Sequence, residues 1–100
     1  MEKLVRDGIP AIVLAAGTVP RFRLASKEDR LPLLFAKLRE EVQELEADRS
    51  LEELADVVEV LRAIQIELDI SDQQLEAERS CKEADRGGFQ KGVVLLLDAV

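Results

Sequence analysis

The sequence contains no histidine, tryptophan or tyrosine, and it has only three phenylalanines and one cysteine, Cys81. Without histidine, both a zinc site of the usual nitrogen and sulfur type and a histidine-based proton relay are excluded. Any bound metal therefore has to be one that prefers oxygen ligands. The scarcity of rings leaves aliphatic side chains to build the core and few groups to stack on a base. A single cysteine cannot form an internal disulfide.

The sequence also lacks a long apolar run. Its charged start predicts neither a signal peptide nor a membrane span, so we expect a cytoplasmic protein with no membrane partner. The net charge of -7, with no visible basic cluster, argues against nucleic acid as a partner because phosphates would be repelled. A phosphate-bearing ligand can still bind if a divalent cation bridges the two negative partners.

What is present is a mixture typical of a small globular protein. The chain has 100 residues, of which 47% are hydrophobic and 35% charged, and we expect residues 1–100 to form a single domain. The core of a 100-residue domain leaves little margin of stability, and a partner subunit would increase that stability.

Two long helices are predicted, Lys27–Ala47 and Leu51–Asp69, from apolar residues that recur every three or four positions. Pro32 makes a later start, at Arg30, an alternative for the first of them. Ser50 has the N-cap spacing for the second. Because only a tight connection separates them, we expect an antiparallel helical hairpin as the core of an all-α fold.

Shorter elements flank this hairpin. A helix over Ile9–Ala16 with Asp7 as N-cap is expected before it, and a helix capped by Ser71 and running through Asp85 is expected after it. Two further segments are less regular. Thr18–Ala25 is predicted to be a short edge strand or an extended connection, and Val93–Leu97 a strand or a packed tail.

Apolar rows indicate which helix faces are buried. The first long helix carries one row, formed by Leu31, Phe35, Leu38, Val42 and Leu45. The second carries a packing seam, formed by Val57, Val60 and Ile64 between Glu53 and Glu67. Beside the seam lies a second apolar row, formed by Leu54, Val58, Leu61 and Leu68.

Two acidic pairs, Glu41 with Glu44 and Glu53 with Asp56, stand at equal distances on either side of the predicted turn. Within each pair, a spacing of three places both carboxylates on one side of a helix. Four converging carboxylates repel one another unless a cation is bound among them. The pattern predicts a Mg²⁺ site, with Mn²⁺ as an alternative cofactor. A solvated acidic face, with Glu53 acting as the partner of the Ser50 cap, is the other interpretation.

Three blocks of sequence carry a family resemblance: KLVRDGIP (3–10), KLREEVQELEADRSLEELADVVEVLRA (37–63) and ADRGGFQKGVVL (84–95). The middle block contains an EExxE motif followed by an ExxD motif. In these blocks the chain resembles the all-α nucleoside triphosphate pyrophosphohydrolases, in their MazG-like and phosphoribosyl-ATP pyrophosphohydrolase-like branch. The chain departs from that branch at Gly8, where relatives commonly carry Lys, and in the short spacing between the two motifs.

The resemblance implies that Glu41, Glu44, Glu53 and Asp56 are Mg²⁺ ligands in a single MazG-like domain. It implies hydrolysis of a nucleotide between the α and β phosphates, giving a monophosphate and pyrophosphate. It also implies a small helical bundle completed by oligomerisation into a homodimer or homotetramer, with short extended terminal segments.

Within this hypothesis Glu40 is the candidate catalytic residue that orients or deprotonates the attacking water, although a solvated position is the alternative for it. The candidate substrate-binding residues are the basic ones near the motifs: Lys37, Arg6, Arg86 and Lys91. An ordinary helix ion pair is the alternative for Lys37, and a plain helix stop is the alternative for the glycines beside Arg86.

Two rival functions stay open. One is a non-catalytic helical module that oligomerises through its apolar seam and carries an acidic surface. The other is an enzyme of the same fold that acts on a phosphoribosylated or damaged nucleotide.

Overall fold

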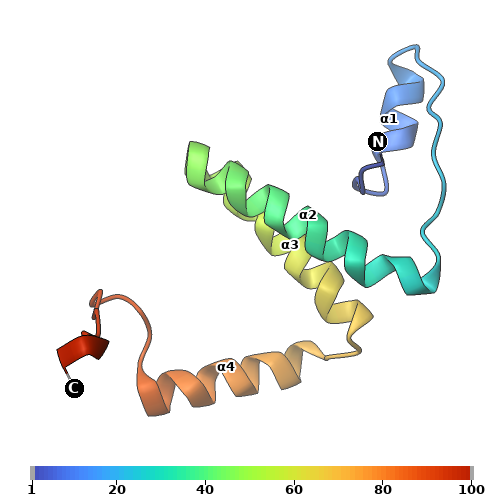
Figure 1. The fold of residues 1–100 in the computed structure, drawn as a ribbon. Coiled ribbons are helices and arrows are strands. Elements are labelled where there is room, and N and C mark those ends of the chain that lie inside the picture. Colours follow the sequence, from blue (N-terminus) through green and yellow to red (C-terminus); the bar gives the residue numbers. More distant parts are fainter. Residues whose placement is uncertain (1, 100) are drawn as a thin grey trace. The chain divides into compact units, whose positions relative to one another are not determined.

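The computed structural model describes residues 2–99 and contains helices but no strand within that range. The helices are α1 (Ile9–Ala15), α2 (Lys27–Asp48), α3 (Leu51–Glu67), α4 (Asp72–Arg86) and the short 3-10 helix η1 (Leu97–Ala99) (Figure 1). The all-α class predicted from the sequence is confirmed. Of the two predictions for Thr18–Ala25, the extended connection is the correct one.

α1 begins at the predicted residue, Ile9, and ends one residue before the predicted end, but its cap differs from the prediction. Gly8, not Asp7, occupies the N-cap position, and no side chain caps the helix. Asp7 lies one residue too early to accept a hydrogen bond from the first turn. Pro10 stands in that first turn, where its missing N–H costs nothing. Gly17, with a φ of 99°, follows the helix in the left-handed region that glycine favours.

α2 starts at the earlier of the two predicted positions, and Pro32 lies inside it. The Ser26 side chain accepts a hydrogen bond from the Asp29 backbone N–H at 3.3 Å, which satisfies a donor that the first turn leaves unpaired. Acidic side chains in that first turn interact favourably with the positive end of the helix dipole. These contributions offset the single backbone hydrogen bond that Pro32 cannot make.

The ends of α3 and α4 also follow from local chemistry. Arg49 takes a left-handed conformation, with a φ of 55°, and Ser50 caps the Glu53 N–H at 3.2 Å, so only two residues separate α2 from α3. At the start of α4, Ser71 and Gln74 form a reciprocal capping box. Gly87, with a φ of 83°, ends that helix where the sequence predicted a stop.

The core lies between α2 and α3, which pack against each other. Leu34, Val60 and Ile64 are buried there, with Leu31 and Leu38 partly buried beside them. The predicted seam of α3 is thus confirmed. The predicted row of α2 is partly wrong, because Leu34 is buried whereas Phe35 and Val42 are 42% and 38% exposed.

The chain divides into two compact units, Met1–Asp69 and Ile70–Val100. The first unit holds the core and all of the acidic motif residues. In the second unit, no residue of α4 is buried. Among the described residues, no helix combines the length and apolar character needed to cross a membrane.

Val93–Leu97 forms neither a strand nor a packed tail, so both predictions for it are wrong. Residues 92–96 have no regular secondary structure, and the five apolar side chains from Val93 to Leu97 are 65% to 85% exposed. A strand needs a neighbouring strand for its backbone hydrogen bonds, and residues 2–99 supply none.

Candidate metal site

The acidic motifs of α2 and α3 meet in two overlapping groups of carboxylates. One group is formed by Glu40, Glu41 and Glu44, and the other by Glu41, Glu53 and Asp56. Within each group, one oxygen from every residue lies within 4.8 Å of the others. Glu41 belongs to both groups, so it links the two helices through a single side chain.

Glu41 is the only buried charged residue in the described part of the chain, with 5% of its surface exposed. It lies seven positions after Leu34 and three after Leu38, so it occupies the helix face that the core covers. The Lys37 ammonium lies 3.0 Å from Glu41 Oε1. Glu41 Oε2 is buried, and within residues 2–99 it has no hydrogen-bond partner. A buried carboxylate oxygen without a partner is costly and is uncommon in folded proteins.

Glu53 presents a second oxygen of this kind. Its Oε2 is also buried and has no partner in the part of the chain that the structure describes. Desolvation raises the pKa of Glu53 above its ordinary value, and the nearby charges of Glu44 and Asp56 raise it further. Both causes act against the ionised form, so a cation beside Glu53 would relieve both.

Three basic side chains surround the carboxylates. Arg6 Nη2 donates a hydrogen bond to Asp56 Oδ1 at 2.6 Å, and Lys3 Nζ lies 2.7 Å from Glu40 Oε1. Lys37 Nζ lies 3.6 Å from that same Glu40 oxygen. The Lys3 hydrogen bond, followed by the charge of Lys37, lowers the pKa of Glu40 below its ordinary value. A carboxylate with a lowered pKa stays ionised at neutral pH and is a weak proton acceptor.

The donor set fits a hard divalent cation. Every candidate ligand atom is a carboxylate oxygen, which is the ligand type that Mg²⁺ and Mn²⁺ prefer. The two residues that carry a buried oxygen without a partner, Glu41 and Glu53, belong to the same group. Acidic groups are common on helix surfaces without any metal, but burial of the shared member distinguishes this cluster from a solvated face.

The predicted site residues divide between the two units. Glu41, Glu53 and Asp56 come together, Glu44 joins through the group that shares Glu41, and Arg6 and Lys37 contact members of the cluster. Arg86 and Lys91 lie in the second unit, where both are exposed. Arg86 Nε lies 3.8 Å from the carboxylate of its neighbour Asp85.

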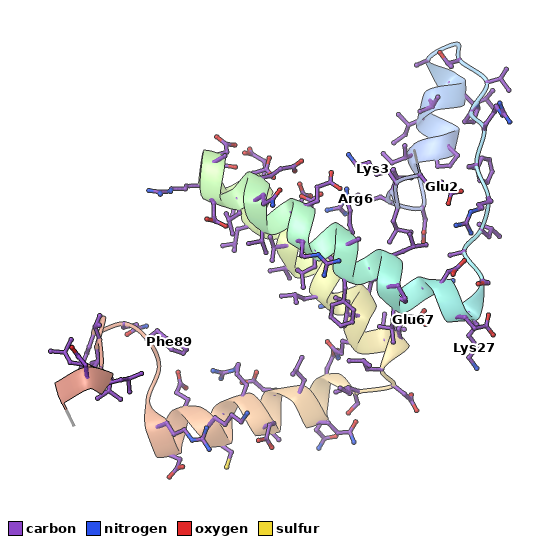
Figure 2. All side chains as sticks on the ribbon, viewed as in Figure 1. Glu2, Lys3, Arg6, Lys27, Glu67 and Phe89 are labelled. Atoms are coloured by element: carbon purple, nitrogen blue, oxygen red, sulfur yellow. The ribbon has the colours of Figure 1, made fainter. Side chains whose placement is uncertain are left out.

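Lys3 is the residue that sequence reasoning missed. It approaches α2 from the segment before α1, and Figure 2 labels it beside Arg6 on that segment. Lys3 lies in the first of the three sequence blocks, but a segment without regular secondary structure has no periodicity that shows which basic residue reaches a helix. A cleft of ≈ 310 Å³ lies between this segment and α2, and Lys3, Lys37 and Glu40 are among its lining residues.

Comparisons with known proteins assign no function to this arrangement. No family model matches the chain, and no solved structure matches it. An uncharacterised protein from Mycolicibacterium smegmatis is 47% identical over 47 residues, which are 47% of this chain and 48% of that protein. The chain thus matches about half the length of this relative.

Proposed function

We propose that this chain is a nucleotide pyrophosphohydrolase that depends on Mg²⁺, or on Mn²⁺ in its place. The substrate is a nucleoside triphosphate or a related nucleotide, which is cleaved between its α and β phosphates. Water adds to the α phosphorus as the bridging P–O bond breaks, and the products are a nucleoside monophosphate and pyrophosphate.

The observation that carries this proposal is the burial of Glu41 at the junction of the two carboxylate groups. The residue is 5% exposed, and its Oε2 has no partner within residues 2–99. Glu53 Oε2 has the same property in the same group. Two buried, unpaired carboxylate oxygens on residues of one cluster are unfavourable by themselves and become favourable when they share a divalent ion.

Each residue of the cluster has a role in this proposal. Glu41, Glu53 and Asp56 hold the cation, and Glu44 contributes from the group that shares Glu41. The cation, when bound, stabilises the negative charge on the phosphate oxygens. Glu40 orients the attacking water, which suits a carboxylate whose pKa lies below its ordinary value. Lys37 and Arg6 neutralise the outer phosphates.

The proposal includes an antiparallel hairpin of α2 and α3 that a second copy of the chain completes into a helical bundle. The support for it is the second apolar row of α3. Leu54, Val58 and Leu61 are each between 47% and 49% exposed. A row of apolar residues that is half exposed along one helix is typical of a face that another helix covers.

The direct test is the release of pyrophosphate from a panel of nucleoside triphosphates and modified nucleotides in the presence of Mg²⁺. We expect Glu53→Gln and Asp56→Asn to lose the activity, because each removes a charge from the group that holds the cation. Glu46→Gln, a substitution of an exposed glutamate on α2, is the matched control and should retain it. Equal activity in all four proteins would remove the proposed mechanism.

The rival function is a non-catalytic interaction module with an acidic surface, and the apolar row of α3 would serve it equally well. A Mg²⁺ titration of the melting temperature separates the two. A cation that binds only the folded protein raises its melting temperature in a saturable manner. For the rival, Mg²⁺ and NaCl would act alike at equal ionic strength, because both would only screen surface charge.

A further inference from the structure

The segment before α1 is held against the carboxylate cluster at two points. Lys3 pairs with Glu40 on α2, and Arg6 pairs with Asp56 on α3. Between them, Leu4 packs against the core formed by the two helices. The segment therefore carries two cationic side chains to the cluster, one to each helix. Figure 2 labels both residues on this segment.

A count of the charges shows what this arrangement can bind. The cluster contains five carboxylates, Glu40, Glu41, Glu44, Glu53 and Asp56, and three basic groups pair with its members, namely Lys3, Arg6 and Lys37. Two negative charges are left without compensation, so an anion that approaches is repelled. One divalent cation brings the sum to zero and removes that repulsion.

The two ion pairs made by the segment are easily exchanged. Lys3 and Arg6 each expose 55% of their side chains, and solvent-exposed salt bridges contribute little to stability. Lys37, by contrast, is 16% exposed and pairs with the buried Glu41. A cation that binds Asp56 competes mainly with Arg6, which can turn towards another anion at small cost.

The cleft beside the cluster has room for such an anion. Its volume is ≈ 310 Å³, which is near the lower limit for small-molecule pockets. Lys3 and Lys37 line it together with Glu40, and Leu4 is among its apolar lining residues. Two ammonium groups that share one carboxylate at the wall of a cleft can both donate to a phosphate chain.

We propose that Lys3, Arg6 and Lys37 form a binding site for a phosphate chain, and that this site opens when a divalent cation replaces Arg6 on Asp56 and neutralises the carboxylates that Lys3 and Lys37 face. Binding is consequently ordered: the cation binds before the anion or together with it. This inference rests on the proposed function, because it takes Asp56 and Glu41 as ligands of the cation. It adds Lys3 to the site. It also means that Arg6 pairs with Asp56 before the cation binds and with the phosphate chain afterwards.

The test uses calorimetric titration of the whole chain after dialysis against a chelator and then against chelator-free buffer. Mg²⁺ alone is titrated first, and inorganic pyrophosphate is then titrated in excess Mg²⁺. For Arg6→Gln and Lys3→Gln, we expect Mg²⁺ to bind about two- to fivefold more tightly, since a competing positive charge is gone. Pyrophosphate should bind these variants about tenfold more weakly, since a hydrogen bond to a charged group is lost.

The opposite signs of the two effects distinguish this proposal from a merely structural role of the segment. Arg39→Gln, on an exposed position of α2, is the control and should leave both affinities unchanged. The proposal is overturned if Arg6→Gln and Lys3→Gln weaken Mg²⁺ binding or leave it unchanged. It is also overturned if the wild type binds pyrophosphate equally well without Mg²⁺.

Failure of this inference differs from failure of the proposed function. If Glu53→Gln abolishes Mg²⁺ binding and the wild type releases pyrophosphate from nucleotides, the proposed function stands whatever Arg6→Gln does. If the wild type binds no Mg²⁺ at all, both the proposed function and this inference are wrong.

Discussion

The Lys37 ammonium lies 3.0 Å from Glu41 Oε1, and the two side chains expose only 16% and 7% of their surfaces. The pair spans one turn of α2. Glu41 is buried on the core face, and Lys37 lines the cleft beside the segment before α1. At that depth, solvent screens the interaction much less than it screens an exposed ion pair. Lys37 therefore compensates part of the negative charge that Glu41 brings to the edge of the core.

Replacement of Lys37 should show how much the burial of Glu41 destabilises the fold when its partner is missing. We expect Lys37→Ala to lower the free energy of unfolding by about 3 kcal/mol, because it removes one partner of a largely buried pair. Mg²⁺ should restore more stability to this variant than it adds to the wild type, since the cation compensates the same carboxylate. Urea denaturation with and without Mg²⁺ measures both effects. An equal loss in Arg39→Ala, on an exposed position of α2, would contradict the prediction.

Glu53→Gln should make the chelator-treated protein more stable at neutral pH. Burial and neighbouring carboxylates raise the pKa of Glu53 in the folded protein, so its ionised form opposes folding. That penalty is present above the folded pKa and disappears as the pH falls through it. The melting temperature of the variant in chelator should therefore exceed that of the wild type at pH 7, and the two should converge under acidic conditions.

Glu52→Gln is the control for this comparison because its side chain is exposed in the same turn of α3. It should leave the melting temperature and its Mg²⁺ dependence unchanged, whereas Glu53→Gln should abolish the stabilisation by Mg²⁺. If the wild type were more stable than Glu53→Gln at pH 7 in chelator, the ionised carboxylate of Glu53 would not destabilise the fold and the prediction would be wrong.

The sequence was sufficient to predict the helices and to predict that the two acidic motifs come together. Serine caps and glycine stops are local signals, so Ser50, Ser71 and Gly87 predicted element ends to within a residue or two. The short link between the two long helices then brought Glu41 to Asp56, as their equal spacing about the turn predicted, and also to Glu53, whereas Glu44 belongs to the other group.

The sequence predicted the wrong set of buried residues on α2, and the reason is physical. Positions 31, 35, 38, 42 and 45 have helical spacing, but so do 31, 34, 38, 41 and 45, and apolar content favoured the first set. The structure uses the second set and places Glu41 within it. A carboxylate on the core face is invisible to a search for apolar periodicity, although it is the feature that distinguishes the candidate site from a solvated surface.

The contacts of the segment before α1 could not be predicted from the sequence, for a different reason. Lys3 and Arg6 reach residues far along the chain, and those pairings depend on how a segment without regular secondary structure contacts two packed helices. No local rule of spacing describes that crossing. The placement of Arg86 and Lys91 near the site stays a prediction, because both belong to the second unit.

The core gives a matched pair of substitutions on one helix. Ile64 is 7% exposed and packs with Leu34 and Val60, whereas Ile66 is 73% exposed. We expect Ile64→Ala to cost about 2–5 kcal/mol and Ile66→Ala less than about 0.5 kcal/mol. If Ile64→Ala fails to fold, Ile64→Val should still show a loss of about 0.5–1.5 kcal/mol in urea denaturation. Equal effects at the two positions would contradict the assignment of the core.

The half-exposed row of α3 leads to a prediction about assembly. Val58 lies between Leu54 and Leu61 on this row, each one helical turn away, and a charge at its centre would have to be desolvated on contact with a second copy. We expect the wild type to sediment as a dimer or larger oligomer and Val58→Glu as a monomer with unchanged helix content. Sedimentation velocity and circular dichroism measure the two properties.

Ile66→Glu is the control for this substitution because Ile66 is an exposed apolar residue of α3 outside the row. It should sediment as the wild type does, since the same charge in a solvated position costs no desolvation energy. Because the carboxylate cluster lies within one copy of the chain, Val58→Glu should still show stabilisation by Mg²⁺. A monomeric wild type, or an Ile66→Glu variant that dissociates as readily as Val58→Glu, would exclude this row as the interface.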